Sequence, residues 1–422
     1  MKRILPIILA FVLVGCGSST SSETVETVET IQETGVEKDG TVQLRIWGAE
    51  EDQAMLAQMG ESFKAKYASE ADIELIFEPQ SESNCKDVLL GDVLNAADVF
   101  AFADDQLLSL AASGVLMEVE NADAIKAANL TEAVSAATIG DRLFAFPMTA
   151  DNGYFMYYNK EYFTEEQVQS MDAMLLAAEE AGKKIAMDWS SGWYTYSFFG
   201  NTGMEFGLNE DGVTNYCTWN GSGNGVTGAD VAAAMYKIAQ SPAFASMINS
   251  DFIAGVQDGS VIACVSGVWD AANVKAALGD NWAATVPPTI TINGEAKQLM
   301  SFGGSKAIAV NPNCENPKAA AALAAWLGSA DAQLAHYEFN GTAPVSVALM
   351  TENEEISSNP SFKAAVDTVG TASIAQPSIP EMNSFWGAAE AMGNAIYNGE
   401  VTHDNAEEKT ADFNVSLNET GL

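Results

Sequence analysis

Two pairs of adjacent carboxylates are the groups in this sequence that could do acid–base chemistry. Glu50 and Glu51 follow the segment TVQLRIWGA, and Asp104 and Asp105 follow ADVFAFA. Two carboxylates that flank a glycosidic bond can hydrolyse it, provided that one has a raised pKa in a dry pocket. The chain has only 2 histidines, which argues against histidine-based catalysis. Hydrolysis is therefore the rival to a binding role, and we expect a protein that is not an enzyme.

The elements that must position these groups begin after an N-terminal export signal. Lys2 and Arg3 precede an apolar run that ends in Leu13-Val14-Gly15-Cys16, the order of a signal peptide with a lipobox. We expect residues 1–15 to be removed and Cys16 to be lipidated. Residues 16–40 are rich in Ser, Thr and Glu, and this composition predicts a disordered acidic linker. The expected location is the outer face of the cytoplasmic membrane, by a lipid anchor.

Charge and cysteine content exclude several classes of partner. The 57 acidic and 19 basic residues give a net charge of −38, which argues against nucleic acid and against phosphate-rich ligands. The cysteines after Cys16 form no C-x-x-C pair, so neither a metal site nor a cofactor is expected, and free thiols are favoured over disulfides. The glycine-rich segment 221–228 has no following lysine and is interpreted as a turn, not a phosphate loop.

Residues 41–422 are too many for one core, because a single core stops growing beyond about 250–300 residues, so two lobes are expected. Strands are predicted at Thr41–Trp47, Ile73–Phe77 and Ala97–Ala101, with helices between them. This alternation favours an α/β fold with parallel sheets, and ligands bind at the carboxyl ends of such strands. The segment 147–152 is a hinge candidate.

The second half is expected to be an aromatic strand followed mainly by helices. Tyr154–Asn159 is predicted to begin the second lobe, and helices are expected to dominate from Met204 through Gln240. Val261–Ser266 is predicted to be a buried strand, and Ser301–Val310 to cross back to the first lobe. No internal repeat of fixed period is evident.

Several sequence blocks in this order resemble those of a known family. They are Ala97-Asp98-Val99-Phe100 with Asp105, then Phe146-Pro147 leading to Tyr158-Asn159-Lys160, Gly267-Val268-Trp269, Phe302-Gly303-Gly304-Ser305 and residues 379–386, IPEMNSFW. Their colinear order resembles the family 1 extracellular solute-binding proteins of ABC transporters, in the maltose/maltodextrin branch. The resemblance implies a two-lobed periplasmic-binding-protein-like fold with crossing hinge strands and a ligand cleft between the lobes. The implied N-lobe is 41–149 with 303–348, and the C-lobe is 150–302 with 349–422.

The resemblance also implies which aromatic residues contact the ligand. Flat rings suit the apolar faces of a sugar, and the chain has 8 Trp, 11 Tyr and 19 Phe. Trp269 and Trp386 match stacking tryptophans of the second lobe. Trp193 matches a stacking tyrosine, and Phe102 stands where the first lobe has a stacking tryptophan. The alternative for each ring is an ordinary core or surface position.

Among polar groups, Asp105 matches a carboxylate that binds sugar hydroxyls. Glu51, or its neighbour Glu50, corresponds to another, and Asn152 or Asp151 falls where the family has a glutamate near the hinge. The alternative for the run Glu50-Glu51-Asp52 is a helix start favoured by the helix dipole.

The sequence departs from the family pattern at Gln106, at Glu390 and at Asp52, which stands where the family has a lysine beside the first-loop acid. Gln106 and Glu390 replace basic residues, so the sugar class is retained but disaccharide preference is put in doubt. The implied partners are a neutral oligosaccharide and ABC permease subunits, with a monomeric receptor. The alternatives are a xylo- or galacto-oligosaccharide as cargo, or a sensor in place of an import component.

Overall fold

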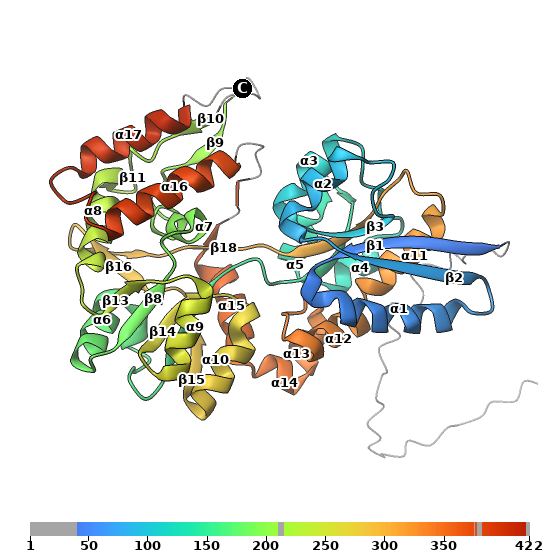
Figure 1. Ribbon diagram of the computed structural model, residues 1–422, viewed down its shortest axis with the longest axis horizontal. Coiled ribbons are helices and arrows are strands. Elements are labelled where there is room, and N and C mark those ends of the chain that lie inside the picture. The colour runs from blue at the N-terminus through green and yellow to red at the C-terminus, as the bar shows by residue number, and fades with distance from the viewer. Residues whose placement is uncertain (1–39, 210–214, 375, 378–381, 419–422) are drawn as a thin grey trace, which may run out of the picture.

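The computed structural model describes residues 40–209, 215–374, 376–377 and 382–418. The predicted signal peptide, the lipidation site Cys16, the linker up to residue 39 and residues 379–381 lie outside these ranges. Figure 1 shows the described residues as two lobes joined by a narrow waist, with the blue N-terminal strands in one lobe and the red C-terminal helices in the other. The expected α/β fold with two lobes is confirmed.

The N-lobe is built on a five-stranded sheet in the order β2-β1-β3-β19-β6. The strands are β1 (Thr41–Gly48), β2 (Asp72–Pro79), β3 (Val99–Ala103), β6 (Phe146–Thr149) and β19 (Lys306–Val310). The helices around it are α1 (Gln53–Tyr67), α2 (Cys85–Gly91), α3 (Leu107–Ala112), α4 (Asp123–Ala128), α5 (Thr131–Ala136), α11 (Pro317–Leu327) and α12 (Ala330–Asn340). Strand β3 is buried at all five positions, as expected for a central strand covered on both faces.

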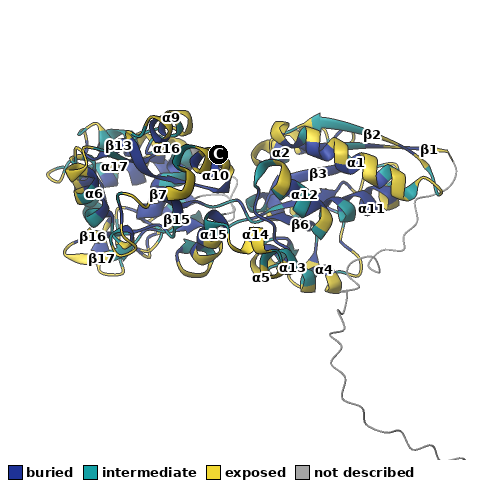
Figure 2. Cartoon of the chain, turned by 90° about the horizontal axis from the view of Figure 1, so that it is seen from below, coloured by how far each residue is buried: buried dark blue, intermediate teal, exposed yellow. Residues whose placement is uncertain are grey.

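The C-lobe is built on a second five-stranded sheet in the order β13-β8-β14-β7-β15. The strands are β7 (Phe155–Asn159), β8 (Lys184–Met187), β13 (Phe244–Ser246), β14 (Val261–Ser266) and β15 (Trp282–Thr285). The helices are α6 (Met171–Glu180), α7 (Gly192–Thr195), α8 (Gly228–Ala239), α9 (Asn249–Asp258), α10 (Ala271–Leu278), α15 (Pro360–Thr371), α16 (Met382–Tyr397) and α17 (Ala406–Asn418). Figure 2 shows buried strands at the centre of each lobe and exposed helices outside them.

The expectation of purely parallel sheets is wrong at the strands that follow a crossing between lobes. β19 pairs antiparallel with β3, and β7 pairs antiparallel with both β14 and β15. The carboxyl ends of β1, β2 and β3 face the other lobe. A chain segment that arrives from the other lobe therefore enters the sheet at the carboxyl ends of these strands. It then runs in the opposite direction to them, which makes its pairing antiparallel.

The expectation that helices dominate from Met204 onward is also wrong before α8. Two short hairpins precede that helix: β9 (Phe206–Leu208) with β10 (Asn215–Cys217), and β11 (Ser222–Gly223) with β12 (Val226–Thr227). Gly207 carries no side chain where a Cβ would lie 2.8 Å from the Tyr216 ring, so the two strands can pair closely. Further short strands are β4 (Thr138–Ile139) with β5 (Arg142–Leu143), and β16 (Thr289–Ile292) with β17 (Glu295–Gln298).

Hydrogen bonds join the segments that connect the lobes. The chain passes from β6 to β7 through residues 150–154, and from β18 (Ser301–Phe302) to β19 through residues 303–305. It passes again after α12, through α13 (Val347–Glu352) and α14 (Glu354–Ser357), to α15. β18 pairs in parallel with β20 (Ser373–Ile374). The amide of Tyr154 donates to Ser301 Oγ at 2.7 Å. The crossing segments therefore support one another.

Gly153 tests how tightly two of these segments are packed. A Cβ at this position would lie 2.4 Å from the carbonyl oxygen of Phe302, and backbone cannot yield as a flexible side chain can. We expect Gly153→Ala to destabilise the protein by about 1–3 kcal/mol. Gly370→Ala is the matched control, because a Cβ there meets nothing within 4 Å, and it should be neutral or stabilise by about 0.5–1 kcal/mol in helix α15. Chemical denaturation measures both. Equal stability of the two variants would contradict the packing argument.

Candidate ligand-binding site

A cleft of about 620 Å³ lies between the lobes and is lined by three groups of residues. The N-lobe contributes Ser83, Asn84, Lys86, Asp87, Asp105 and Gln106. The C-lobe contributes Ser190, Ser191, Trp193, Trp269, Trp386 and Glu390. The segment that crosses from β6 to β7 contributes Asp151 and Asn152, the first residue of β19 is Lys306, and Gln376 lies beyond β20. One wall is therefore mainly polar, and the other carries three tryptophans.

Each tryptophan of the C-lobe wall is positioned by a helix or by the end of a strand. Trp193 belongs to α7, which follows β8, and Trp269 belongs to the 3₁₀ turn after β14. Trp386 belongs to the first turns of α16. The rings of Trp193 and Trp269 lie 6.0 Å apart between centroids with an interplanar angle of 44°. Such rings present apolar faces together with an indole N–H, which is the surface that a sugar ring needs.

Two glycines make this arrangement possible. A Cβ at Gly267 would lie 2.1 Å from the Trp269 ring, so the absence of a side chain lets that ring fold back over the backbone. A Cβ at Gly192 would lie 2.6 Å from the carbonyl oxygen of Trp386. Gly192 therefore lets α7 and α16 approach closely and brings Trp193 near Trp386. Trp269 remains 39% exposed, which leaves it available to a ligand.

Asp105, like Asp87, lines the cleft on the opposite wall. Burial raises its pKa to about 7, and the negative charge of Asp104 adds to the effect. Burial also raises the pKa of Asp104, to about 6. Asp104 does not line the cleft; it accepts hydrogen bonds from the Ser305 amide at 2.7 Å and from Asn152 Nδ2 at 3.3 Å. One acid of the pair is thus directed to the ligand, and the other joins the N-lobe to the crossing segments.

Gln106 lines the cleft, but its amide is used within the protein. The Oε1 atom accepts from the Lys86 amide at 2.8 Å, and Nε2 donates to the carbonyl oxygens of Glu82 and Ser83. The side chain is 4% exposed. Where the family pattern has a basic residue, this chain therefore has an amide that fixes the loop after β2.

A buried ion pair joins the segment that crosses from β6 to β7 to the start of β19. Lys306 Nζ lies 3.0 Å from Asp151 Oδ2, and Thr149 Oγ1 donates to the other carboxylate oxygen. Burial is the largest influence on Asp151 and would raise its pKa, but Lys306, the hydrogen bond from Thr149 and the nearby His336 together lower the pKa. Burial alone would lower the pKa of Lys306, but Asp151 and then Glu82 raise it. Both groups are therefore held in their charged forms.

The structure brings together six of the nine predicted ligand contacts. Asp105, Asp151, Asn152, Trp193, Trp269 and Trp386 all line the cleft. The prediction for Phe102 is wrong: strand β3 continues to Ala103, so Phe102 lies inside the strand and is fully buried in the N-lobe core. Glu50 and Glu51 are exposed and do not line the cleft. Their neighbour Asp52 is buried against His336 and Asn340, so this run begins a helix and fixes α12.

Sequence reasoning missed Ser83, Asn84, Lys86 and Asp87, as well as Lys306 and Gln376. The first four follow β2 at its carboxyl end, which is the general location of ligand sites in such sheets and was a usable signal. Lys306 begins β19 and Gln376 follows β20, and neither position carries a sequence signal of its own.

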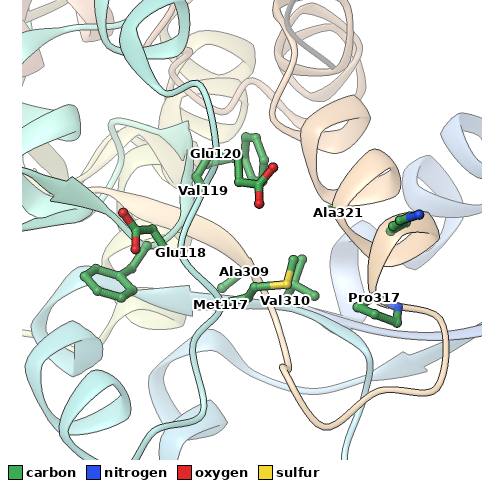
Figure 3. Close-up of a pocket in the computed structure, with 11 residues that line it drawn as sticks. Met117, Glu118, Val119, Glu120, Ala309, Val310, Pro317 and Ala321 are labelled. Atoms are coloured by element: carbon green, nitrogen blue, oxygen red, sulfur yellow. The ribbon is translucent and has the colours of Figure 1, made fainter. Parts of the chain in front are cut away.

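A second hollow, of about 180 Å³, lies in the N-lobe away from the cleft. Figure 3 shows Met117, Val119, Val310 and Pro317 around it, with the carboxylates of Glu118 and Glu120 nearby. Val310 and Lys306 are at opposite ends of β19, so this hollow is remote from the tryptophan wall. Its lining includes Phe144, Phe146, Glu118 and Glu120, but all of its residues belong to the N-lobe and none is a tryptophan.

The described ranges contain four cysteines. Cys85, Cys217, Cys264 and Cys314 form no disulfide there. The described residues contain no group of three or more His, Cys, Asp or Glu that could hold a metal ion. Of the helices that the structure describes, none has the length and apolar character needed to cross a membrane.

Comparisons with known proteins agree with this geometry. A 24% identical relative over 400 residues, from Streptococcus pneumoniae serotype 4, is a maltooligosaccharide ABC transporter solute-binding lipoprotein, with 91% of this chain and 88% of the relative covered. The maltodextrin-binding protein MdxE of Bacillus subtilis strain 168 is 26% identical over 355 residues, covering 79% and 80%. A solved structure with acarbose is 36% identical, with a TM-score of 0.78, covering 90% of this chain and all of that chain.

Two lobes joined by crossing segments, with a cleft lined from both sides, define the class of receptors that close around a small ligand. The family model described as bacterial extracellular solute-binding protein matches residues 59–364. The chain belongs to this family, and the relatives support the maltose/maltodextrin branch. Membership places the protein outside the cytoplasm.

The ion pair between Lys306 and Asp151 generates a prediction about stability. Lys306→Met leaves the buried Asp151 carboxylate without its partner, and we expect a loss of about 3 kcal/mol. The double variant Lys306→Met/Asp151→Asn removes the uncompensated charge and should recover most of that loss. Guanidinium denaturation of the two single variants and the double variant gives the coupling. If the two single losses simply add in the double variant, the ion pair is not the stabilising contact.

Proposed function

We propose that this protein is a lipid-anchored receptor that captures a neutral maltodextrin-type oligosaccharide and delivers it to an ABC importer. The observation that carries the proposal is the cleft with Trp193, Trp269 and Trp386 on one wall and Asp105 on the other. The names of the relatives from Streptococcus pneumoniae and Bacillus subtilis support the same class of ligand.

The two walls suit the two kinds of surface on a sugar. A pyranose ring has apolar C–H faces, which stack on tryptophan, and hydroxyl edges, which form hydrogen bonds. An ionised carboxylate accepts hydroxyl hydrogens in charge-assisted bonds. The volume of about 620 Å³ falls within the range of ordinary ligand pockets. A neutral, polyhydroxylated chain fits this combination, whereas an anion would be repelled by the overall charge of −38.

The mechanism is capture by closure, without covalent chemistry. The sugar stacks on the tryptophans of the C-lobe and then forms hydrogen bonds with the N-lobe. The contacts made by both lobes at once favour the closed state. We expect micromolar affinity, equivalent to about −8 kcal/mol.

Delivery of the sugar requires two further partners, the membrane and the ABC permease subunits. The proposed monomer is held at the membrane by lipid on Cys16, and in the closed state it presents both lobes to ABC permease subunits. The genes beside this gene distinguish import from sensing. Permease genes there would support import, and a histidine kinase gene would support a sensor.

The choice of sugar is tested by calorimetry against a panel of oligosaccharides. We expect maltotriose and longer α-glucans to bind. Xylo- and galacto-oligosaccharides are included because the Gln106 side chain forms its hydrogen bonds within the protein and Glu390 is an acid at the cleft.

Trp386→Ala should weaken maltotriose binding at least about tenfold, since an aromatic contact and its buried area are lost. Phe339→Ala is the control, because that ring is 48% exposed and does not line the cleft. Absence of heat with every glucan would refute the maltodextrin assignment.

The pKa of Asp105 predicts a pH dependence of binding. With a pKa raised to about 7, the carboxyl is ionised above pH 7 and becomes protonated as the pH falls, which weakens the charge-assisted bonds to sugar hydroxyls. We expect maltotriose affinity to fall by about threefold to tenfold between pH 8 and pH 5.5. Asp105→Asn should bind weakly at both pH values, with most of the pH dependence lost. An unchanged pH profile in the variant would remove Asp105 from the sugar site.

A further inference from the structure

Gln376 forms hydrogen bonds with both walls of the cleft. Its Nε2 donates to Asp105 Oδ2 on the N-lobe at 2.9 Å. Its Oε1 accepts from Trp193 Nε1 on the C-lobe at 3.0 Å. Gln376 itself lines the cleft. One planar amide therefore bridges a carboxylate and an indole that belong to different lobes.

The backbone around this amide is anchored close to the crossing segments. Gln376 follows β20, which pairs with β18, and the amide of Gly303 donates to the Ile374 carbonyl oxygen at 3.0 Å. A side chain on this strand end can reach both lobes, because the lobes diverge from the crossing segments.

The bridge engages the polar atom that fixes the orientation of Trp193. An indole has one N–H and no acceptor, so this donor is fully used by Gln376 Oε1. The ring of Trp193 is also held by Tyr154, whose ring lies 4.7 Å away at 75°. The edge of Trp193 is thus fixed within the protein, while the residue still lines the cleft.

We propose that Gln376 is an interlobe latch: by joining Asp105 to Trp193 it favours the closed spacing of the two walls before a ligand binds. The effect on sugar affinity rests on the proposed function, whereas the effect on lobe spacing does not. A receptor whose closed state is already populated loses less affinity to the closure step. Gln376 is therefore a positioning residue for the carboxylate and the tryptophan.

In the opposite role, Gln376 would compete with the ligand. Its amide would occupy the position of two sugar hydroxyl groups in the cleft, and a ligand would have to displace it. This role predicts tighter binding when the side chain is removed, and the latch predicts weaker binding. The sign of the change therefore separates the two.

The spacing of the lobes is tested by small-angle X-ray scattering of the ligand-free protein. Gln376→Ala should show a larger radius of gyration than the wild type. Gln58→Ala, at an exposed position on α1, is the matched control and should not change it. An unchanged radius in Gln376→Ala would overturn the latch, whatever sugar the protein binds.

Gln376→Glu provides a second variant of the same length. Its carboxylate can still accept from Trp193 but has no hydrogen for Asp105, whose other charged neighbours are Asp104 and Lys86. At pH 8 two carboxylates face each other and the lobes should open. At pH 5.5 a proton shared between them should restore the bridge and the smaller radius. The wild type should have the same radius at both pH values. Opening of Gln376→Glu that does not depend on pH would contradict a bridge through Asp105.

Affinity for maltotriose is the second readout. We expect Gln376→Ala to bind about threefold to tenfold more weakly, which corresponds to the net contribution of a typical hydrogen bond that acts through closure. Equal or tighter binding by this variant would overturn the latch. If the wild type binds no glucan, the proposed function fails, and the scattering result alone decides the role of Gln376.

Discussion

The cleft depends on the polar contacts that hold the crossing segments to the N-lobe, among them the ion pair of Lys306 and Asp151. Asp151 belongs to the segment that crosses from β6 to β7, whereas Lys306 begins strand β19 of the N-lobe sheet, and their charged groups lie 3.0 Å apart. Each charge is costly to bury alone and is stabilised by the other. Next to this pair, Asp104 accepts from the amide of Ser305 and the side chain of Asn152. These contacts hold both crossing segments to the N-lobe at the base of the cleft.

Topology explains why the aromatic and polar walls face each other. In the N-lobe the carboxyl ends of β2 and β3 carry Asn84 and Asp105, and in the C-lobe those of β8 and β14 lead to Trp193 and Trp269. Each sheet directs the same edge toward the partner lobe, because the chain enters and leaves both sheets there. The C-lobe then supplies the rings, helped by Gly192 and Gly267, which leave space for them. The N-lobe supplies the hydrogen-bonding groups, and closure brings the two kinds of surface onto one ligand.

Chain length and buried patterns were sufficient to predict the two lobes and most of the strands, and the family resemblance identified the tryptophans that line the cleft. The sequence was less informative elsewhere. The predicted site was wrong where it depended on the exact residue at which a strand ends. Strand β3 continues to Ala103, so Phe102 is in the core and not in the cleft. It also failed where a polar side chain selects one of several partners. Gln106 bonds to its own lobe, Asp52 and not Glu50 or Glu51 is buried, and Gln376 reaches across the cleft. Such choices are set by tertiary neighbours that no local pattern records.

The central claim is that the cleft between the lobes is the oligosaccharide site, with the tryptophans as platforms. A crystal structure of the protein grown with maltotriose tests this claim most directly. The account predicts sugar rings stacked on Trp193, Trp269 or Trp386, with hydroxyl groups within hydrogen-bond distance of Asp105. A maltotriose molecule bound elsewhere, for example in the N-lobe hollow beside Met117 (Figure 3), with the cleft left without sugar, would contradict it.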